Sequence, residues 1–236
     1  AADVRGLPCR LVSCSGKSSS TFTQPTQQPP APREFFHVKS LLLIGCGGHA
    51  RSLIDLIEAS YEWRIHGLVG LPQQVGSLVL GYPVIGSDAD LPLLFEECSA
   101  AVLAIGQLPD PAPRERLAAQ LERLGFEFPL LISPHAAVSR HAQLGPGSTL
   151  AHGVIVNAGA VVGNHCILNS RSLIEHDVQI GHHCHISTGV LVNGGVRVGS
   201  GSFIGSGAMI REGLDLPPLT VIGAGKRVMG WPLRDQ

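Results

Sequence analysis

The chain has 236 residues and a formal net charge of −1, from 17 basic and 18 acidic residues. A charge so close to zero gives no reason to expect a nucleic-acid partner. No apolar run approaches the roughly 18 residues that a membrane-spanning helix needs, so no membrane partner is expected. The six cysteines lack CxxC spacing, which argues against a disulfide framework or a structural zinc site. A reduced, cytoplasmic protein is therefore expected.

Residues 1–38 differ in composition from the rest of the chain. Residues 13–32 are mostly Ser, Thr, Gln and Pro, and such a segment cannot bury enough apolar area to offset the cost of ordering. We therefore predict a disordered N-terminal extension. It is rich in Ser and poor in acidic residues, as transit peptides are, but the absence of an initiator Met equally fits a fragment of a longer chain.

The next segment, residues 39–130, is predicted to form a small, Rossmann-like α/β domain. An apolar strand over residues 41–44 leads into the glycine-rich turn 45–49 and an amphipathic helix over 51–59. This order opens nucleotide-binding βαβ units, with phosphate facing the helix N-terminus. The full GxGxxG fingerprint is absent, and residues 70–72, Gly-Leu-Pro, stand where an acidic residue would follow the second strand. Asp88 is a candidate substitute, and a structural turn without ligand is the alternative.

Two further elements complete this domain. A strand is predicted over residues 101–105, ending in Gly106. An amphipathic helix is predicted over residues 114–124, with Gly125 as its C-cap. Residues 126–131 then lead into a segment of different character.

The segment 131–236 carries an aliphatic residue at every sixth position. The series is Ile132, Val138, Leu144, Leu150, Val156, Val162, Leu168, Ile174, Ile180, Ile186, Val192, Val198, Ile204, Ile210, Leu216, Ile222 and Val228. This period is that of the hexapeptide repeat of a parallel β-helix, in which three hexapeptides make one triangular coil. Residues 18 apart should then stack in successive coils and fill the interior. Small residues that follow the aliphatic ones, such as Gly145 and Asn157, suit corners with unusual φ and ψ.

Most histidines of the chain lie in this segment. They are His135, His141, His152, His165, His176, His182, His183 and His185. A metal site is one interpretation, but γ-class carbonic anhydrases use two ligands five residues apart, and no two histidines here have that spacing. Neighbours in the run 182–185 would point to opposite faces of a strand. For His182 and His183 we expect solvated turn positions.

A general base is the other interpretation. In Glu175-His176-Asp177 one imidazole stands between two carboxylates, and a carboxylate can hold its tautomer and stabilise the imidazolium. The pKa of histidine suits removal of a proton from an amine or hydroxyl. Cys166 and Cys184 share a column with Ser148 and Ser202, which predicts small interior packing residues without a chemical role.

The order and spacing of several motifs resemble the PglD/NeuD-type sugar acyltransferases over residues 40–230. The motifs are Ile44-Gly45-Cys46-Gly47-Gly48-His49, Ile167-Leu168-Asn169, Ile174-Glu175-His176-Asp177, His183-Cys184-His185-Ile186-Ser187 and Asn193-Gly194-Gly195-Val196. The resemblance implies a left-handed β-helix over residues 131–236 and a homotrimer with active sites between subunits. It implies direct transfer of acetyl from acetyl-CoA to an amino or hydroxyl group of a sugar, without a metal.

The resemblance also implies roles for single residues. His176 matches the catalytic base and Asp177 its orienting carboxylate, with Glu175 beside them. The residues that match the acetyl-CoA pocket are Asn169, His185, Gly194, Gly223, Ala224 and Gly225, and the N–H of Gly194 would face the thioester carbonyl. Those that match the holder of a nucleotide-linked sugar are Gly45, Gly47, Gly48, His49 and Gly106.

Other functions stay open from the sequence. The acceptor could be a nucleotide-linked amino sugar, or sialic acid or a related free sugar acetylated on oxygen. A metal-dependent hydratase and a non-catalytic trimeric scaffold are the alternatives outside this class.

Overall fold

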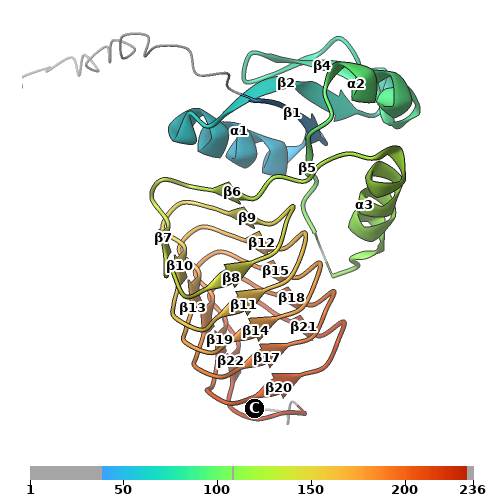
Figure 1. Ribbon diagram of the computed structural model, residues 1–236. Helices are drawn as coiled ribbons and strands as arrows, with labels where there is room; N and C mark the ends of the chain where they lie inside the picture. Colours follow the sequence, from blue (N-terminus) through green and yellow to red (C-terminus); the bar gives the residue numbers. More distant parts are fainter. Residues whose placement is uncertain (1–38, 108, 233–236) are drawn as a thin grey trace, which may run out of the picture. The chain divides into compact units, whose positions relative to one another are not determined.

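The computed structural model describes residues 39–107 and 109–232, in which a helix-covered sheet is followed by a stack of short-stranded coils (Figure 1). The extension expected over residues 1–38 lies outside the described residues. The expected division of the chain near residue 130 stays a prediction, although the first strand of the coils begins at Leu131.

The helix-covered sheet has five strands in the order β3-β4-β2-β1-β5. They are β1 (Lys39–Ile44), β2 (Trp63–Gly70), β3 (Leu78–Val79), β4 (Tyr82–Ser87) and β5 (Ala101–Leu103). Strands β4, β2, β1 and β5 are parallel, and β3 pairs antiparallel with β4. The parallel order is that of half a doubly wound fold, in which ligands bind beyond the carboxyl ends of the strands.

Helices cover both faces of this sheet, so residues 41–44 of β1 are apolar and buried on both sides. The helices are α1 (Gly48–Ser60), α2 (Leu91–Glu97) and α3 (Ala112–Leu124), with 3₁₀ turns η1 (Pro72–Gln74) and η2 (Asp88–Asp90). Alternate β1 residues face opposite sides. Leu41 and Leu43 pack with α1, while Leu42 and Ile44 pack with α2 and α3.

The structure confirms the strand, glycine-turn and helix order at the start of this domain. It also confirms the later strand and helix, and Gly125 caps α3 with φ of 90°. Strand β4 and helix α2 were not predicted, because Tyr82-Pro83 and Leu91-Pro92 interrupt the patterns that reveal such elements.

The coils are a parallel β-helix, and every aliphatic residue of the six-residue series is the second residue of a two-residue strand. The strands are β6 (Leu131–Ile132), β7 (Ala137–Val138), β8 (Gln143–Leu144), β9 (Thr149–Leu150), β10 (Ile155–Val156), β11 (Val161–Val162), β12 (Ile167–Leu168), β13 (Leu173–Ile174), β14 (Gln179–Ile180), β15 (His185–Ile186), β16 (Leu191–Val192), β17 (Arg197–Val198), β18 (Phe203–Ile204), β19 (Met209–Ile210), β20 (Asp215–Leu216), β21 (Val221–Ile222) and β22 (Arg227–Val228). Each strand from β6 to β19 pairs with the strand 18 residues on, as Ile155 of β10 does with Leu173 of β13.

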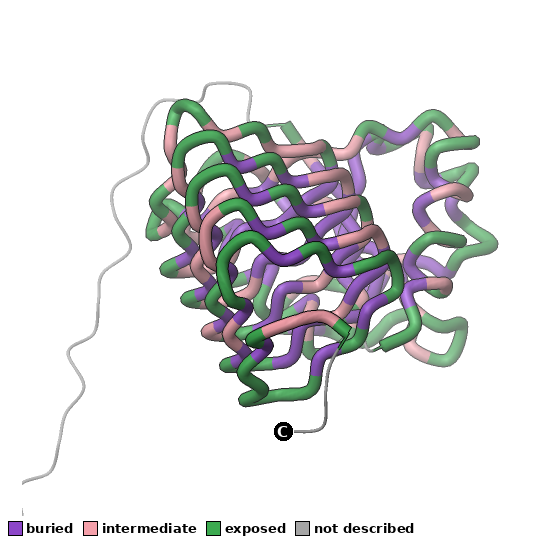
Figure 2. Tube along the Cα trace, turned by 90° about the horizontal axis from the view of Figure 1, so that it is seen from below, coloured by how far each residue is buried: buried purple, intermediate pink, exposed green. Residues whose placement is uncertain are grey.

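Three flat faces result from this stacking. The β7–β22 face has the order β22-β19-β16-β13-β10-β7, the β8–β20 face has β20-β17-β14-β11-β8, and the β6–β21 face has β21-β18-β15-β12-β9-β6. Aliphatic residues fill the interior, visible as the buried inner side of the coils in Figure 2. Cys166 and Cys184 lie in this core, as predicted, and their thiols donate to the carbonyls of Gly181 and Gly199.

The corners correct one expectation about glycine. The residue directly after the aliphatic one does not have positive φ. Positive φ occurs at the third residue after the aliphatic one, where nine glycines and five other residues adopt it. Gly145 and its equivalents are small for a different reason. A Cβ on Gly199, for example, would lie 2.3 Å from the backbone nitrogen of Pro218 in the next coil. The first corner position is therefore limited by the approach of neighbouring coils.

Candidate functional site

The predicted base lies on an exposed corner between the β7–β22 and β8–β20 faces. His176 and Asp177 follow β13 and precede β14, and their side chains are 66% and 72% exposed. The Nδ1–H of His176 donates to Oδ2 of Asp177 over 2.9 Å. This bond leaves Nε2, the outer ring nitrogen, as the proton acceptor. The pair thus has the arrangement of a base and its orienting carboxylate.

Carboxylates raise the pKa of His176 above its ordinary value. The hydrogen bond to Asp177 is the largest cause, partial desolvation opposes it, and the charges of Asp177 and Glu175 add to it. The two carboxylates that flank His176 in the sequence contribute differently. Glu175 does not bond the ring: its Oε2 accepts from Nδ2 of Asn157 at 2.9 Å and from the backbone N–H of His176 at 3.3 Å. Glu175 therefore acts on the ring only through its charge.

Two glycines of adjacent coils make room for this pair. A Cβ on Gly159, one coil before, would lie 2.4 Å from Oδ1 of Asp177, and a Cβ on Gly194, one coil after, would lie 2.6 Å from Nε2 of His176. Asp177 itself has φ of 60°, a conformation that costs a residue with a side chain roughly 1–2 kcal/mol. Most equivalent corners carry glycine at this position. Asp177 thus adopts this conformation while its carboxylate bonds the imidazole.

The N–H of Gly194 takes no part in the backbone hydrogen bonds between the coils that the structure describes. Its carbonyl accepts from Gly213, and the neighbouring Gly195 N–H donates to the carbonyl of His176. No acceptor for the Gly194 N–H exists among the residues that the structure describes. A backbone donor beside Nε2 of a base is the arrangement that an oxyanion requires.

A second corner carries the other residues predicted for acetyl-CoA. Asn169 and Gly223 both follow strands of the β6–β21 face and precede the β7–β22 face, three coils apart. Ala224 and Gly225 continue this exposed edge, and a Cβ added to Gly225 would meet no atom within 4 Å. Asn169 and His176 therefore lie at opposite ends of the β7–β22 face within one protomer.

His185 lies on neither of these corners. It belongs to β15, and its Nδ1–H donates to the carbonyl of Gln107 over 2.7 Å, while its ring packs edge-on against Phe203 at 5.2 Å. Its Nε2 is buried and has no partner within the described part of the chain, as is the case for Nε2 of His49. The charge of His185 is one of the causes that lower the pKa of His49, after burial and the charge of Arg114. The structure thus joins a residue predicted for the nucleotide with one predicted for acetyl-CoA.

A buried arginine connects this cluster to the coils. Arg114 of α3 is 1% exposed and donates to the carbonyls of Leu103, Ile105 and His165. Burial and the charge of Arg114 lower the pKa of His49 to about 3, and burial lowers the pKa of Arg114 to about 10. His49 is therefore neutral and Arg114 cationic at neutral pH.

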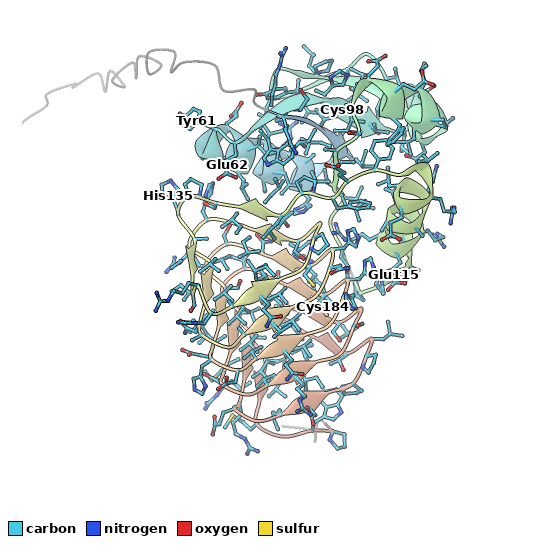
Figure 3. The ribbon with its side chains drawn as sticks, in the orientation of Figure 1. Tyr61, Glu62, Cys98, Glu115, His135 and Cys184 are labelled. Carbon is cyan, nitrogen blue, oxygen red and sulfur yellow. The ribbon has the colours of Figure 1, made fainter. Side chains whose placement is uncertain are left out.

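Two corner histidines beneath α3 were not predicted to pack. His165 and His183 have positive φ and stack with ring centroids 5.0 Å apart. The expectation of a solvated position is wrong for His183, because its Nδ1 is buried; burial lowers its pKa. His182 is exposed as expected. Figure 3 labels Glu115 of α3, whose charge raises the pKa of His183, and Cys184 within the coils.

The glycine-rich turn lines a cavity of about 610 Å³ at the carboxyl ends of β1, β2 and β5. Of the residues predicted for the nucleotide, Gly45 and Gly47 line the cavity. Gly48 and His49 are the first residues of α1 and, like Gly106, are not part of the lining. Gly45 has φ of 123°, and a Cβ there would lie 2.6 Å from Ile105. The first turn of α1 contains no acidic residue, so its N–H groups are available to an anion.

The described residues offer neither a metal site nor a membrane-spanning helix. Residues 39–107 and 109–232 contain no group of three His, Cys, Asp or Glu side chains placed to hold a metal ion. Among the helices of these ranges, none combines the length and hydropathy of a membrane span.

Comparison with known proteins places the chain. The family described as the PglD N-terminal domain matches residues 40–121. A variant of perosamine N-acetyltransferase from Caulobacter crescentus, solved with CoA and GDP-perosamine, is 33% identical, covering 84% of this chain and 90% of that one, with a TM-score of 0.76. The chain belongs to the PglD/NeuD-type sugar acyltransferase family. It is an acyltransferase, and its second part is the left-handed β-helix of this family.

Further solved structures agree with this placement. The acetyltransferase domain of PglB from Neisseria gonorrhoeae is 30% identical, covers 81% of this chain and 91% of its own, and has a TM-score of 0.72. WeeI from Acinetobacter baumannii, at 21% identity and a TM-score of 0.64, shares the fold, over 83% of this chain and 99% of that chain. A comparison with curated proteins gave no match.

Proposed function

We propose that this acyltransferase moves acetyl from acetyl-CoA to an amino or hydroxyl group of a nucleotide-linked sugar, with His176 as the general base. The observation that carries the proposal is the His176–Asp177 pair, 2.9 Å apart on an exposed corner, with the Gly194 backbone beside Nε2. Structures of related proteins hold CoA with GDP-perosamine, or acetyl coenzyme A. Both kinds of substrate suit surfaces found in this chain.

The chemistry requires one proton transfer and no covalent enzyme intermediate. The acceptor nitrogen or oxygen attacks the thioester carbon, and Nε2 of His176 removes its proton. The Gly194 N–H stabilises the oxyanion of the tetrahedral intermediate. The carbon–sulfur bond then breaks, and the thiolate takes up the proton as free CoA. Asp177 stabilises the imidazolium while it carries that proton.

The co-substrate needs an open edge along which an extended chain can lie. The corner of Gly223, Ala224 and Gly225 offers one, because Gly223 and Gly225 leave space beside the coil. Lys226, next to them, is a cation suited to a phosphate of CoA. Asn169, on the same corner three coils earlier, is suited to the acyl end. We place acetyl-CoA along this edge.

The arrangement of these corners supports a homotrimer with active sites between subunits. The outer residues of the β7–β22 face are mostly apolar: Ala137, Ile155, Leu173, Leu191, Met209 and Arg227. The outer residues of the β8–β20 face are mostly polar: Gln143, Val161, Gln179, Arg197 and Asp215. Three protomers with the apolar face toward a threefold axis would bring the His176 corner of one beside the Asn169 corner of the next. Neither corner alone carries all the residues proposed for catalysis and for acetyl-CoA binding.

The nucleotide of the acceptor is placed in the cavity beside the glycine-rich turn. Its diphosphate would lie at the N-terminus of α1, near Gly47 and Gly48, where backbone N–H groups and the helix dipole attract anions. The loop after β5 lines this site through Ile105, and the carbonyl of Gln107 in the same loop accepts a hydrogen bond from His185. The loop is a direct connection between the nucleotide site and the coils.

The variant H176A tests the proposed base. Acetylation of a nucleotide-linked amino sugar, followed by release of free CoA thiol, should fall about a hundredfold or more, because no other group beside the acceptor removes its proton. Acetyl-CoA binding, measured by calorimetry, should be little changed. H182A is the matched control, since His182 is an exposed corner histidine away from this pair. Near-normal turnover in H176A would exclude His176 as the base.

The variant L191E tests the shared site. Leu191 is 37% exposed on the apolar face, and a buried carboxylate at a subunit contact is costly, so light scattering should show monomers and turnover should fall about a hundredfold. V161E is the control, because Val161 is also 37% exposed but lies on the β8–β20 face. A monomeric L191E with full activity would contradict a site between subunits.

A further inference from the structure

One end of the cavity beside the glycine-rich turn carries two free charges of opposite sign. Asp88 and Arg116 both line the cavity, yet neither has an ion-pair partner among the described residues. Gln120, one helical turn after Arg116 on α3, also lines it, and its Nε2 donates to the backbone carbonyl of Asp88 at 3.4 Å. The three side chains therefore form one polar wall made by η2 and α3.

The topology of the sheet assigns this wall to the base of the nucleotide. In a doubly wound sheet the diphosphate lies after the first strand, the ribose after its neighbour, and the base farther along the sheet. Here β1 ends at the glycine-rich turn, β2 ends at Gly70, and β4, next along, ends just before Asp88. Asp88 is thus placed one strand beyond the proposed ribose position, on the side where the base would lie.

The chemistry of this wall suits guanine better than uracil. An ionised carboxylate only accepts hydrogen bonds, and guanine presents two adjacent donors, N1–H and the N2 amino group. Uracil presents a single N–H between two carbonyl oxygens, which a carboxylate would repel. Arginine pairs with O6 and N7, the acceptors of guanine. We propose that Asp88 and Arg116 select a guanosine-diphosphate-linked sugar as the acceptor, with Asp88 reading the donor edge of guanine.

This inference rests on the proposed function, and binding of free nucleotides separates the two. Titration calorimetry on the full chain should show GDP binding at least about tenfold more tightly than UDP or CDP. D88N should reduce GDP affinity about tenfold or more and bring it close to that for UDP, because an amide both donates and accepts. E96Q, which removes an exposed carboxylate of α2 outside the cavity, should behave like the wild type.

R116Q provides a second measurement that does not depend on the folding of D88N. R116Q should weaken the binding of GDP more than that of UDP if Arg116 contacts the base. Equal weakening of both would mean that Arg116 contacts phosphate, which would overturn its proposed role. Equal or tighter UDP binding by the wild type, or equal loss of both nucleotides in D88N, would overturn the selection of guanine. In that case acetyl transfer to a UDP-linked amino sugar, abolished in H176A, would leave the proposed function intact.

Discussion

The same side chain has opposite properties in two regions of this molecule. His176 and His185 are nine residues apart in one solenoid. His176 lies on an exposed corner with Asp177, which raises its pKa, whereas His185 lies under the loop after β5, where burial lowers its pKa and a backbone carbonyl gives a smaller opposing effect. The corner histidine can exchange protons with a substrate at neutral pH. The buried histidine stays neutral and connects two parts of the fold.

The difference teaches that the place of a residue on the coil decides its chemistry. A corner residue can pair with a neighbouring corner residue and still face solvent, as His176 does. A residue on the β6–β21 face packs beneath α3 or the adjacent loops, where Arg114 adds a positive charge and disfavours a second one. Catalysis is therefore expected from the corner, and communication with the nucleotide site from the buried face.

Among variants that leave the fold intact, the largest effect is expected from G194A. Its Cβ would lie 2.6 Å from Nε2 of His176, so the ring must move, and a displacement of about 1 Å at a reacting atom costs on the order of a hundredfold in turnover. Steady-state kcat measures it. G230A is the matched control, because Gly230 lies in the same corner column two coils on and has no atom within 4 Å of an added Cβ. Equal kcat values for G194A and G230A would show that His176 and Gly194 do not act in one catalytic site.

A smaller effect is expected from D177N. An amide can still accept the Nδ1–H but does not stabilise the imidazolium, so kcat should fall roughly tenfold to a hundredfold. The raised pKa of His176 sets the direction of the expected change in the pH profile. Activity requires the neutral ring, so loss of the Asp177 charge should lower this pKa and shift the acidic limb of kcat/KM to lower pH. D215N, at an exposed carboxylate on the β8–β20 face, should leave the limb unchanged. A limb at the same pH in D177N would show that Asp177 does not act on the base.

The sequence predicts more of the exposed corner than of the buried face. The six-residue series locates every strand of the coils, because a solenoid repeats one physical requirement, an aliphatic side chain facing inward. The pairing of His176 with Asp177 is also predictable, since both residues are neighbours in the chain. The space that Gly159 and Gly194 leave for this pair is not predictable, because the close approach occurs between residues 18 apart.

The buried face depends on contacts that no local pattern contains. Arg114 bonds His165 across 51 residues, and Gln107 bonds His185 across 78, so the sequence offers no periodicity that would predict either contact. The packing of His183 was missed because a polar corner residue is normally solvated. One signal was available: His165 and His183 occupy the corner position that glycine fills in most coils. A bulky residue at a left-handed position indicates a structural constraint that outweighs its cost.

The smallest expected effect, on stability in mild acid, tests the buried side of the comparison. In the folded protein the pKa of His49 is lowered to about 3, so on acidification the unfolded chain binds a proton near its ordinary pKa and the folded chain does not. The free energy of unfolding should therefore decrease as pH falls below about 6.5, by roughly 1.4 kcal/mol per pH unit at most for this histidine. Urea denaturation at constant protein concentration between about pH 7 and pH 5 measures how the free energy of unfolding changes with pH. His165 and His185, whose pKa values burial also lowers, should make this change steeper. H49N should reduce it, and H182N, at an exposed position, should not. Constant stability across this range would show that the cluster is solvated or binds protons while folded.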